Sequence, residues 1–198
     1  MRLFKHFFLA SFVFLSVFAE KIIAAPITEV NLRAGLISAL KQRPSILDFY
    51  KENEYELIWL DKNEVSGQRR AELINSLKTA SFHGLPTKKY QVKKLLDRLS
   101  TSNSLFEIGF LEGLLMISFV DYASDMSSGV LVPSEVDSDI AREKKLKDPN
   151  FYIRALITRD PYDYFRSLGP QTGEYSRLLV EKYKLTEVAK NGGWSPLF

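Results

Sequence analysis

One segment constrains the fold of this 198-residue chain more than any other: residues 105–126 are apolar on almost every side. Ser104 lies just before this segment and Glu107 lies in its first turn. Their spacing is that of a capping box, which satisfies the first free backbone N–H groups of a helix. A helix that is apolar all round is covered by protein or by a membrane. Glu107, Glu112 and Asp121 argue against a membrane. We therefore expect a buried central helix in the core of a folded domain.

Two glycines in this helix, Gly109 and Gly113, lie four residues apart and so share one face. This spacing permits a close approach between two helix backbones. We expect the two glycines to form a flat face against which another helix crosses.

The rest of the chain also has helical periodicity, and prolines and glycines mark the helix ends. Helices are expected at residues 28–42, 46–50, 66–83, 91–99, 151–156, 161–168 and 172–190. The compact apolar run at 56–60 could be a short strand or an extended docking segment, which periodicity cannot decide. The sequence predicts a mainly α fold, a single helical domain around the central helix at about 105–126, with at most a short strand or extended segment near 56–60.

Two further regions carry structural expectations. Residues 130–150 contain Pro133 and alternating charges, so we expect a long surface loop. The last helix has apolar residues at helical spacing, and we expect them to face inward. They are Tyr175, Leu178, Leu179, Leu185 and Val188.

The N-terminus has the layout of a secretory signal peptide at residues 1–19. Arg2 and Lys5 precede an apolar run, and small residues allow cleavage after Ala19 or as late as Ala24. The run is shorter than the roughly 20 residues that span a bilayer. An uncleaved anchor is the alternative, since residues 22–25 could lengthen the run. After cleavage we expect a domain at 28–198, an exported, periplasmic protein and no membrane span.

Charge and cysteine content exclude several function classes. Loss of Arg2 and Lys5 with the signal peptide lowers the formal net charge from +3 to +1, which predicts no nucleic-acid partner. The chain contains no cysteine, so it has neither a thiolate nucleophile nor a thiolate metal ligand. His83 is the one histidine left after cleavage. It lies near a predicted helix end, where a histidine interacts with the helix dipole without catalysis. No metal or cofactor site is predicted.

Asp121 and Asp125 are the candidate carboxylate pair, because their spacing places them on one helix face. Two carboxylates could share acid and base roles in glycoside hydrolysis, or bind calcium together with Asp137 and Asp139. Carboxylates near a helix C-terminus need partners. These partners could be the backbone N–H groups that follow Gly129, or the side chain of either Arg142 or Arg154. We favour this structural role over catalysis.

The aromatic residues could stack on sugar rings, but most occur at helical spacing and are expected in the core. Trp59 and Trp194 flank predicted turns. We take these two as the candidates for a contact surface.

Several motifs, taken together and in order, resemble the N-terminal scaffold domain of the large bacterial L,D-transpeptidases. The resemblance covers the chain from about Thr28 to Phe198. It rests on Phe49-Tyr50, Leu57-Ile58-Trp59, His83-Gly84-Leu85-Pro86 with Tyr90, Asp121-Tyr122-Ala123-Ser124-Asp125 through Gly129 and Pro133, Tyr175 to Tyr183, and Gly192-Gly193-Trp194-Ser195-Pro196-Leu197.

This resemblance implies a periplasmic protein of peptidoglycan cross-linking, with peptidoglycan or a transpeptidase catalytic domain as its partner. In that family the scaffold is followed by a wall-binding module and a catalytic domain with a Ser-His-Gly-Cys motif. The present sequence ends at Phe198 without this motif. No catalytic residue is therefore assigned, and we expect no activity from this chain alone.

Three interpretations stay open. The chain could be a truncated or split transpeptidase, whose catalytic part is lost or encoded separately. It could be a free-standing protein that binds peptidoglycan or a partner enzyme. It could also be a small muramidase-like hydrolase that uses Asp121 and Asp125.

Overall fold

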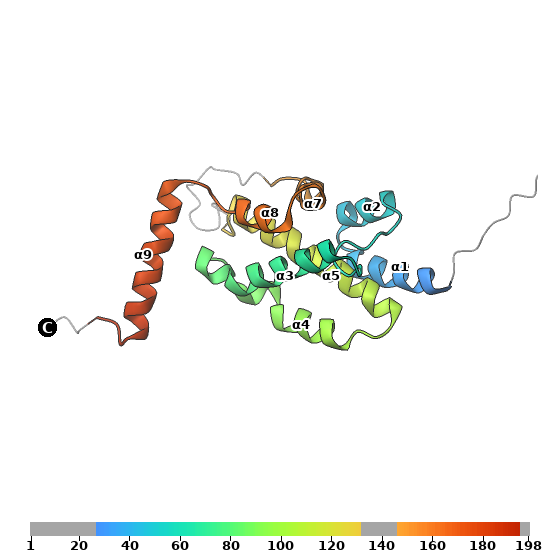
Figure 1. Ribbon diagram of the computed structural model, residues 1–198, viewed down its shortest axis with the longest axis horizontal. Coiled ribbons are helices and arrows are strands. Elements are labelled where there is room, and N and C mark those ends of the chain that lie inside the picture. The colour runs from blue at the N-terminus through green and yellow to red at the C-terminus, as the bar shows by residue number, and fades with distance from the viewer. Residues whose placement is uncertain (1–26, 132–145, 195–198) are drawn as a thin grey trace, which may run out of the picture.

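The computed structural model describes residues 27–131 and 146–194, which form eight α-helices and no strand (Figure 1). The helices are α1 (Ile27–Leu40), α2 (Pro44–Glu52), α3 (Glu64–Thr79), α4 (Val92–Thr101), α5 (Leu105–Ser128), α7 (Pro149–Thr158), α8 (Pro161–Ser167) and α9 (Gly173–Lys190). Two 3-10 turns, η1 (Ala80–His83) and η2 (Thr87–Tyr90), join α3 to α4. The predicted fold class is confirmed. The predicted signal peptide and most of the predicted loop lie outside the described residues.

Helix α5 is the central element, as the sequence predicts. The capping box is present: Ser104 Oγ accepts a hydrogen bond from the Glu107 N–H at 3.1 Å, and the Glu107 carboxylate accepts one from the Ser104 N–H at 3.2 Å. Leu115, Met116 and Phe119 are fully buried. Helices α1, α4 and α7 pack against α5, while α8 packs against α3 and α7. Figure 1 shows α5 running along the long axis of the bundle.

Helix α1 crosses α5 at a point where both helices have glycine residues, which carry no side chain. A Cβ atom added at Gly109 would overlap the Leu32 carbonyl oxygen, and one added at Gly35 would overlap the Phe106 carbonyl oxygen. A Cβ atom at Gly113 would lie 2.6 Å from the Ala39 Cβ atom. The flat face expected from Gly109 and Gly113 is confirmed, and Gly35 is its counterpart on α1.

Helix boundaries agree with the punctuation in the sequence. Pro44 begins α2, and Asn63 caps α3 by accepting a hydrogen bond from the Ser66 N–H at 2.8 Å. Gly84 ends η1 in the left-handed region with φ 77°. Asp160 caps α8 through the Asp163 N–H at 3.0 Å. The caps at Asn63 and Asp160 and the turn at Gly84 thus satisfy backbone groups that would otherwise lack partners.

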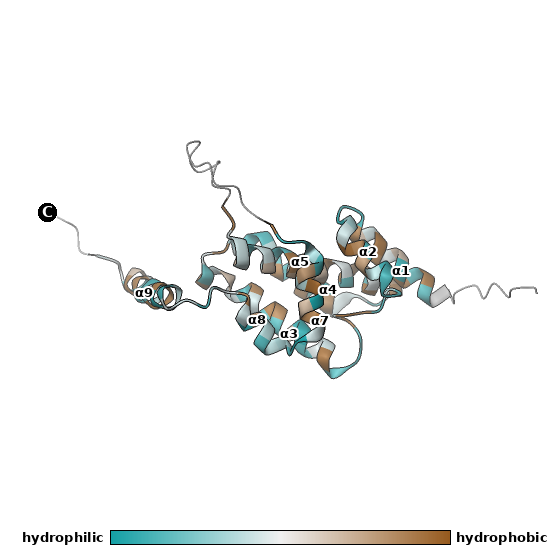
Figure 2. Cartoon of the chain, turned by 90° about the horizontal axis from the view of Figure 1, so that it is seen from above, coloured by the Kyte–Doolittle hydropathy of each residue, from teal (hydrophilic) through white to brown (hydrophobic). Residues whose placement is uncertain are grey.

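The expectation of an inward face on α9 is wrong. No α9 side chain is buried, and Leu178 and Leu185 are 67% and 53% exposed. Figures 1 and 2 both show α9 at one end of the molecule, apart from the other helices. Periodicity shows which side chains share a face, but it cannot show whether that face meets a partner.

None of the helices formed by residues 27–131 and 146–194 combines the length and apolar character that a membrane crossing requires.

The helix crossing predicts a specific sensitivity to added methyl groups. We expect Gly109→Ala to lower the free energy of unfolding by about 1–3 kcal/mol, because its Cβ forces the two backbones apart. Urea denaturation followed by circular dichroism measures this change.

Gly67→Ala is the matched control, since Gly67 lies in α3 and a Cβ there meets nothing within 4 Å. This substitution should raise stability by up to about 1 kcal/mol, because alanine favours helix. Equal effects of the two substitutions would contradict the close crossing.

Candidate functional site

The central helix α5 carries a fully buried carboxylate, Glu112, which is 0% exposed. Its Oε1 atom accepts hydrogen bonds from Tyr50 Oη and the Ile58 N–H, both at 2.7 Å. The Trp59 N–H lies 3.1 Å from Oε1 and 3.2 Å from Oε2, and the Leu60 N–H donates to Oε2 at 2.9 Å. We call this group of five residues the Glu112 anchor.

The Glu112 anchor explains the apolar run at 56–60. That run forms neither helix nor strand, so its backbone N–H groups need other acceptors. The Glu112 carboxylate provides them. The extended docking segment, one of the two alternatives from the sequence, is therefore confirmed, and the strand is not.

The electrostatics of the anchor are those of a buried acid compensated by dipoles. Burial raises the pKa of the Glu112 carboxyl, and the four hydrogen bonds oppose that rise. Burial and the neighbouring Glu112 also raise the pKa of Tyr50 well above its ordinary value. All four partner groups act as donors, an arrangement that suits a carboxylate. The anchor therefore positions the chain and offers no exposed reacting group.

Sequence reasoning missed this role of Glu112, and it placed Trp59 wrongly. Trp59 is fully buried, and its ring centroid lies 5.5 Å from that of Phe119. The hydrogen bonds from the Trp59 backbone N–H to Glu112 hold this residue so that its indole lies inside the core. Trp194 is 70% exposed, so it stays a candidate for a contact surface. The signal that could have identified Glu112 is a lone carboxylate in the middle of an apolar helix.

The two candidate acids on α5 each have a basic partner. Arg43 Nη2 donates to both carboxylate oxygens of Asp121 at 2.9 and 3.0 Å. Asp125 is nearly buried, and its Oδ2 atom accepts from Lys89 Nζ at 2.6 Å and Tyr90 Oη at 2.8 Å. Burial and the bond to Asp125 raise the pKa of the Tyr90 hydroxyl. These contacts brace α5 against the start of α2 and against η2.

The partners differ from those the sequence suggested. Arg154 lies 3.9 Å from Glu52 instead, and Arg142 is outside the described residues. Asp137 and Asp139 are also outside them, so the structure does not test the calcium alternative. No group of three potential metal-binding side chains forms within the described ranges.

His83 contacts α9 rather than an acid. Its Nδ1 atom lies 2.7 Å from Tyr175 Oη, and the two rings are nearly parallel. Lys182 of α9 donates to the carbonyl oxygens of Ser81 and, at 3.3 Å, Phe82. Burial lowers the pKa of His83, and the nearby Lys182 charge lowers it further. His83 and Lys182 therefore attach α9 to η1.

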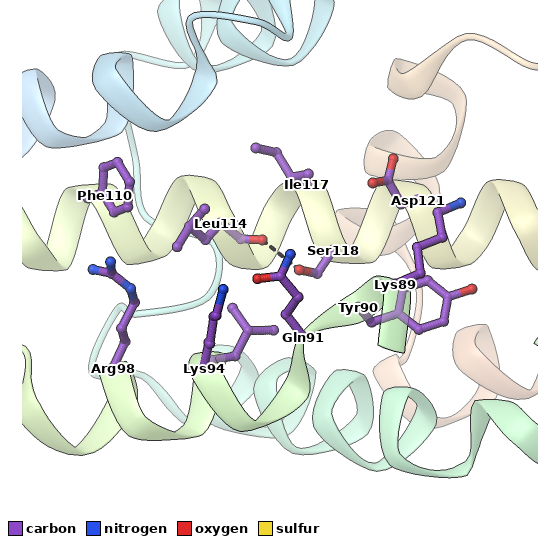
Figure 3. Close-up of a pocket in the computed structure, with 11 residues that line it drawn as sticks. Lys89, Tyr90, Gln91, Lys94, Arg98, Phe110, Leu114, Ile117, Ser118 and Asp121 are labelled. Atoms are coloured by element: carbon purple, nitrogen blue, oxygen red, sulfur yellow. Dashed lines mark hydrogen bonds between the residues drawn. The ribbon is translucent and has the colours of Figure 1, made fainter. Parts of the chain in front are cut away.

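The described surface is hollowed between α4 and α5 by a cleft of about 370 Å³, shown in Figure 3. We call it the α4–α5 cleft. Its chemistry is mixed, with three cationic side chains, an apolar wall and several hydrogen-bonding groups. The lining residues are Lys89, Tyr90, Gln91, Lys94, Leu95, Arg98, Phe110, Leu114, Ile117, Ser118 and Asp121.

Comparison with known proteins identifies the family. A family model described as Scaffold domain matches residues 44–181, more than half of the chain. The chain belongs to the Scaffold domain family. No curated protein and no solved structure matches it. The matched part of this Scaffold domain protein includes the Glu112 anchor and the α4–α5 cleft, whereas α1 precedes it.

The anchor predicts that charge, and not only shape, is required at position 112. We expect Glu112→Gln to lower the free energy of unfolding by about 2–4 kcal/mol, because the glutamine amide group would face backbone donors. Glu72→Gln on α3 is the control, as Glu72 has no hydrogen bond or ion pair within the described residues. Chemical denaturation of both variants measures the difference. A change below about 0.5 kcal/mol for both would contradict the anchor.

The His83 contact predicts a pH dependence. Because the folded pKa lies below the ordinary value of 6.5, the unfolded chain binds the proton more readily. Stability is therefore complete above pH 6.5 and falls as the pH drops from there toward the folded pKa. Thermal denaturation at about pH 7.5 and about pH 5.5 should show a larger loss for the wild type than for His83→Gln. An equal loss in both proteins would exclude His83 as its source.

Proposed function

We propose that this chain is the scaffold portion of a periplasmic L,D-transpeptidase that acts in peptidoglycan cross-linking and cell-wall remodelling. It positions the enzyme's other parts and performs no catalysis alone. The observation that carries this proposal is the Scaffold domain match over residues 44–181, together with the ordered motifs that resemble the transpeptidase scaffold.

The roles of the motif residues support a structural function. Trp59 donates its backbone N–H to Glu112, Tyr90 bonds Asp125, and His83 bonds Tyr175. These contacts join segments that are far apart in the sequence. The motifs behind the resemblance are therefore positions that maintain the fold, as a scaffold requires.

Asp121 and Asp125 fit a scaffold better than a hydrolase. A glycoside hydrolase needs one carboxyl group that donates a proton and one that stays free to act on water or sugar. Here Asp121 accepts two bonds from Arg43, and Asp125 accepts from Lys89 and Tyr90. Both carboxylates are used in bracing α5.

An assay in trans tests the proposal. Purified sacculi are incubated with residues 20–198, with the separately produced catalytic portion of a large L,D-transpeptidase, or with both, and the muropeptides are analysed by mass spectrometry. We expect no change with the scaffold chain alone. With both proteins, we expect more cross-links between diaminopimelate residues than with the catalytic portion alone.

Exposed aromatics provide matched variants. Trp194→Ala should reduce the stimulation if this 70% exposed side chain contacts the catalytic portion, whereas Phe151→Ala, at a side chain 54% exposed on α7, should not. Absence of any stimulation would refute the scaffold role. Muropeptides released by the chain alone, and lost in Asp121→Asn or Asp125→Asn, would instead establish the hydrolase.

A further inference from the structure

The α4–α5 cleft combines features that the scaffold contacts do not use. Its α5 wall is formed by Phe110, Leu114 and Ile117, three half-buried apolar side chains on one helix face. They line a cavity of about 370 Å³, within the range of small-molecule sites. Apolar surface left facing water in a concave site favours a ligand with an apolar body.

The α4 wall carries two cations one helical turn apart. Lys94 has no carboxylate partner among the described residues. The Arg98 guanidinium lies 5.1 Å from the centre of the Phe110 ring and likewise forms no ion pair there. Its charge contributes to lowering the pKa of Glu107, whose carboxylate already accepts hydrogen bonds in the capping box. Figure 3 shows both side chains reaching from α4 toward α5.

Lys89, at the other end of the cleft, differs from these two cations. It bonds Asp125 at 2.6 Å, so its charge is compensated. Lys94 and Arg98, beside the apolar wall, are therefore the cleft cations that form no ion pair within the described residues. A ligand with an anionic end and an apolar body matches this arrangement.

Gln91 adds a group that can recognise an amide. It has φ 47°, in the left-handed region that residues other than glycine rarely adopt. Such backbone conformations are common at binding sites. Its side-chain amide forms no hydrogen bond within the described residues, and Figure 3 shows it between the two helices near Ser118. The amide offers both a donor and an acceptor, the complement of a peptide group.

We propose that the α4–α5 cleft binds a short peptide that carries a free carboxylate. The carboxylate pairs with Lys94 and Arg98, the peptide group bonds Gln91, and an apolar side chain lies against Phe110 and Leu114. An inorganic anion would leave the apolar wall unused, and a fatty acid would leave the Gln91 amide without a partner. This inference goes beyond the proposed function, because it assigns a ligand and requires no transpeptidase activity.

Titration calorimetry of the folded chain, residues 20–198, tests this proposal. The probes are N-acetyl-alanyl-alanine with a free carboxylate, the same dipeptide with an amidated C-terminus, and inorganic phosphate. A stem tripeptide that contains diaminopimelate serves as a fourth probe. We expect both free-carboxylate peptides to bind at least about fivefold more tightly than the amidated peptide or phosphate, which corresponds to the loss of one charge pair.

Matched variants locate the site. Lys94→Gln and Arg98→Gln should each weaken peptide binding about fivefold or more. Lys93→Gln should not, because Lys93 is an exposed α4 lysine that does not line the cleft. Gln91→Gly should weaken binding while the thermal stability is kept or raised, since glycine accepts the positive φ. This variant separates a binding loss from a folding defect.

Each outcome decides the question. Tighter binding of the stem tripeptide than of the alanine dipeptide would support the site and identify the bacterial cell wall as the source of the peptide. Equal binding of the two would support the site with general peptide recognition. The proposal would be overturned if no peptide bound, or if the amidated peptide or phosphate bound as tightly as the free-carboxylate peptides. It would also be overturned if Lys93→Gln and Lys94→Gln weakened peptide binding equally. None of these results depends on the assay in trans, so the two proposals can fail separately.

Discussion

The buried Glu112 carboxylate binds a segment without regular secondary structure to the central helix of the bundle. Burying a charge without partners costs several kcal/mol, so α5 and residues 58–60 are stable only together. Their hydrogen bonds place Trp59 in the core against Phe119. Phe119 in turn lies 5.9 Å, between ring centres, from Phe165 of α8. One carboxylate thus connects the N-terminal helices with the C-terminal part of the bundle.

Helix α5 can serve as this centre because each of its faces has a different chemistry. The glycine face, with Gly109 and Gly113, lets α1 approach to backbone contact. The Glu112 face takes the irregular segment, and Asp125 braces η2 through Lys89 and Tyr90. The face toward α4 keeps apolar groups at an open cleft. The faces of α5 are therefore used for packing and bracing, and one of them also lines the cleft.

Local signals in the sequence were sufficient to predict the helices and their ends, but not the contacts that each helix makes with the rest of the fold. The Ser104 capping box, the stop at Gly84 and the apolar run of α5 depend on neighbouring residues, so they could be predicted. The bond between Asp121 and Arg43 joins residues 78 positions apart, and no local pattern indicates it. The exposure of α9 likewise depends on what surrounds the helix. The α4–α5 cleft was missed because its two walls become neighbours only in the folded chain.

Hydrogen exchange at the backbone amides of Ile58, Trp59 and Leu60 tests whether the Glu112 anchor holds residues 58–60 against α5. These N–H groups belong to no helix or strand, yet they donate to Glu112. We expect protection within about tenfold of that at Leu115 in the middle of α5, because the anchor opens only when the core opens. Exchange at the rate of an unstructured loop at all three amides, while Leu115 stays protected, would contradict it.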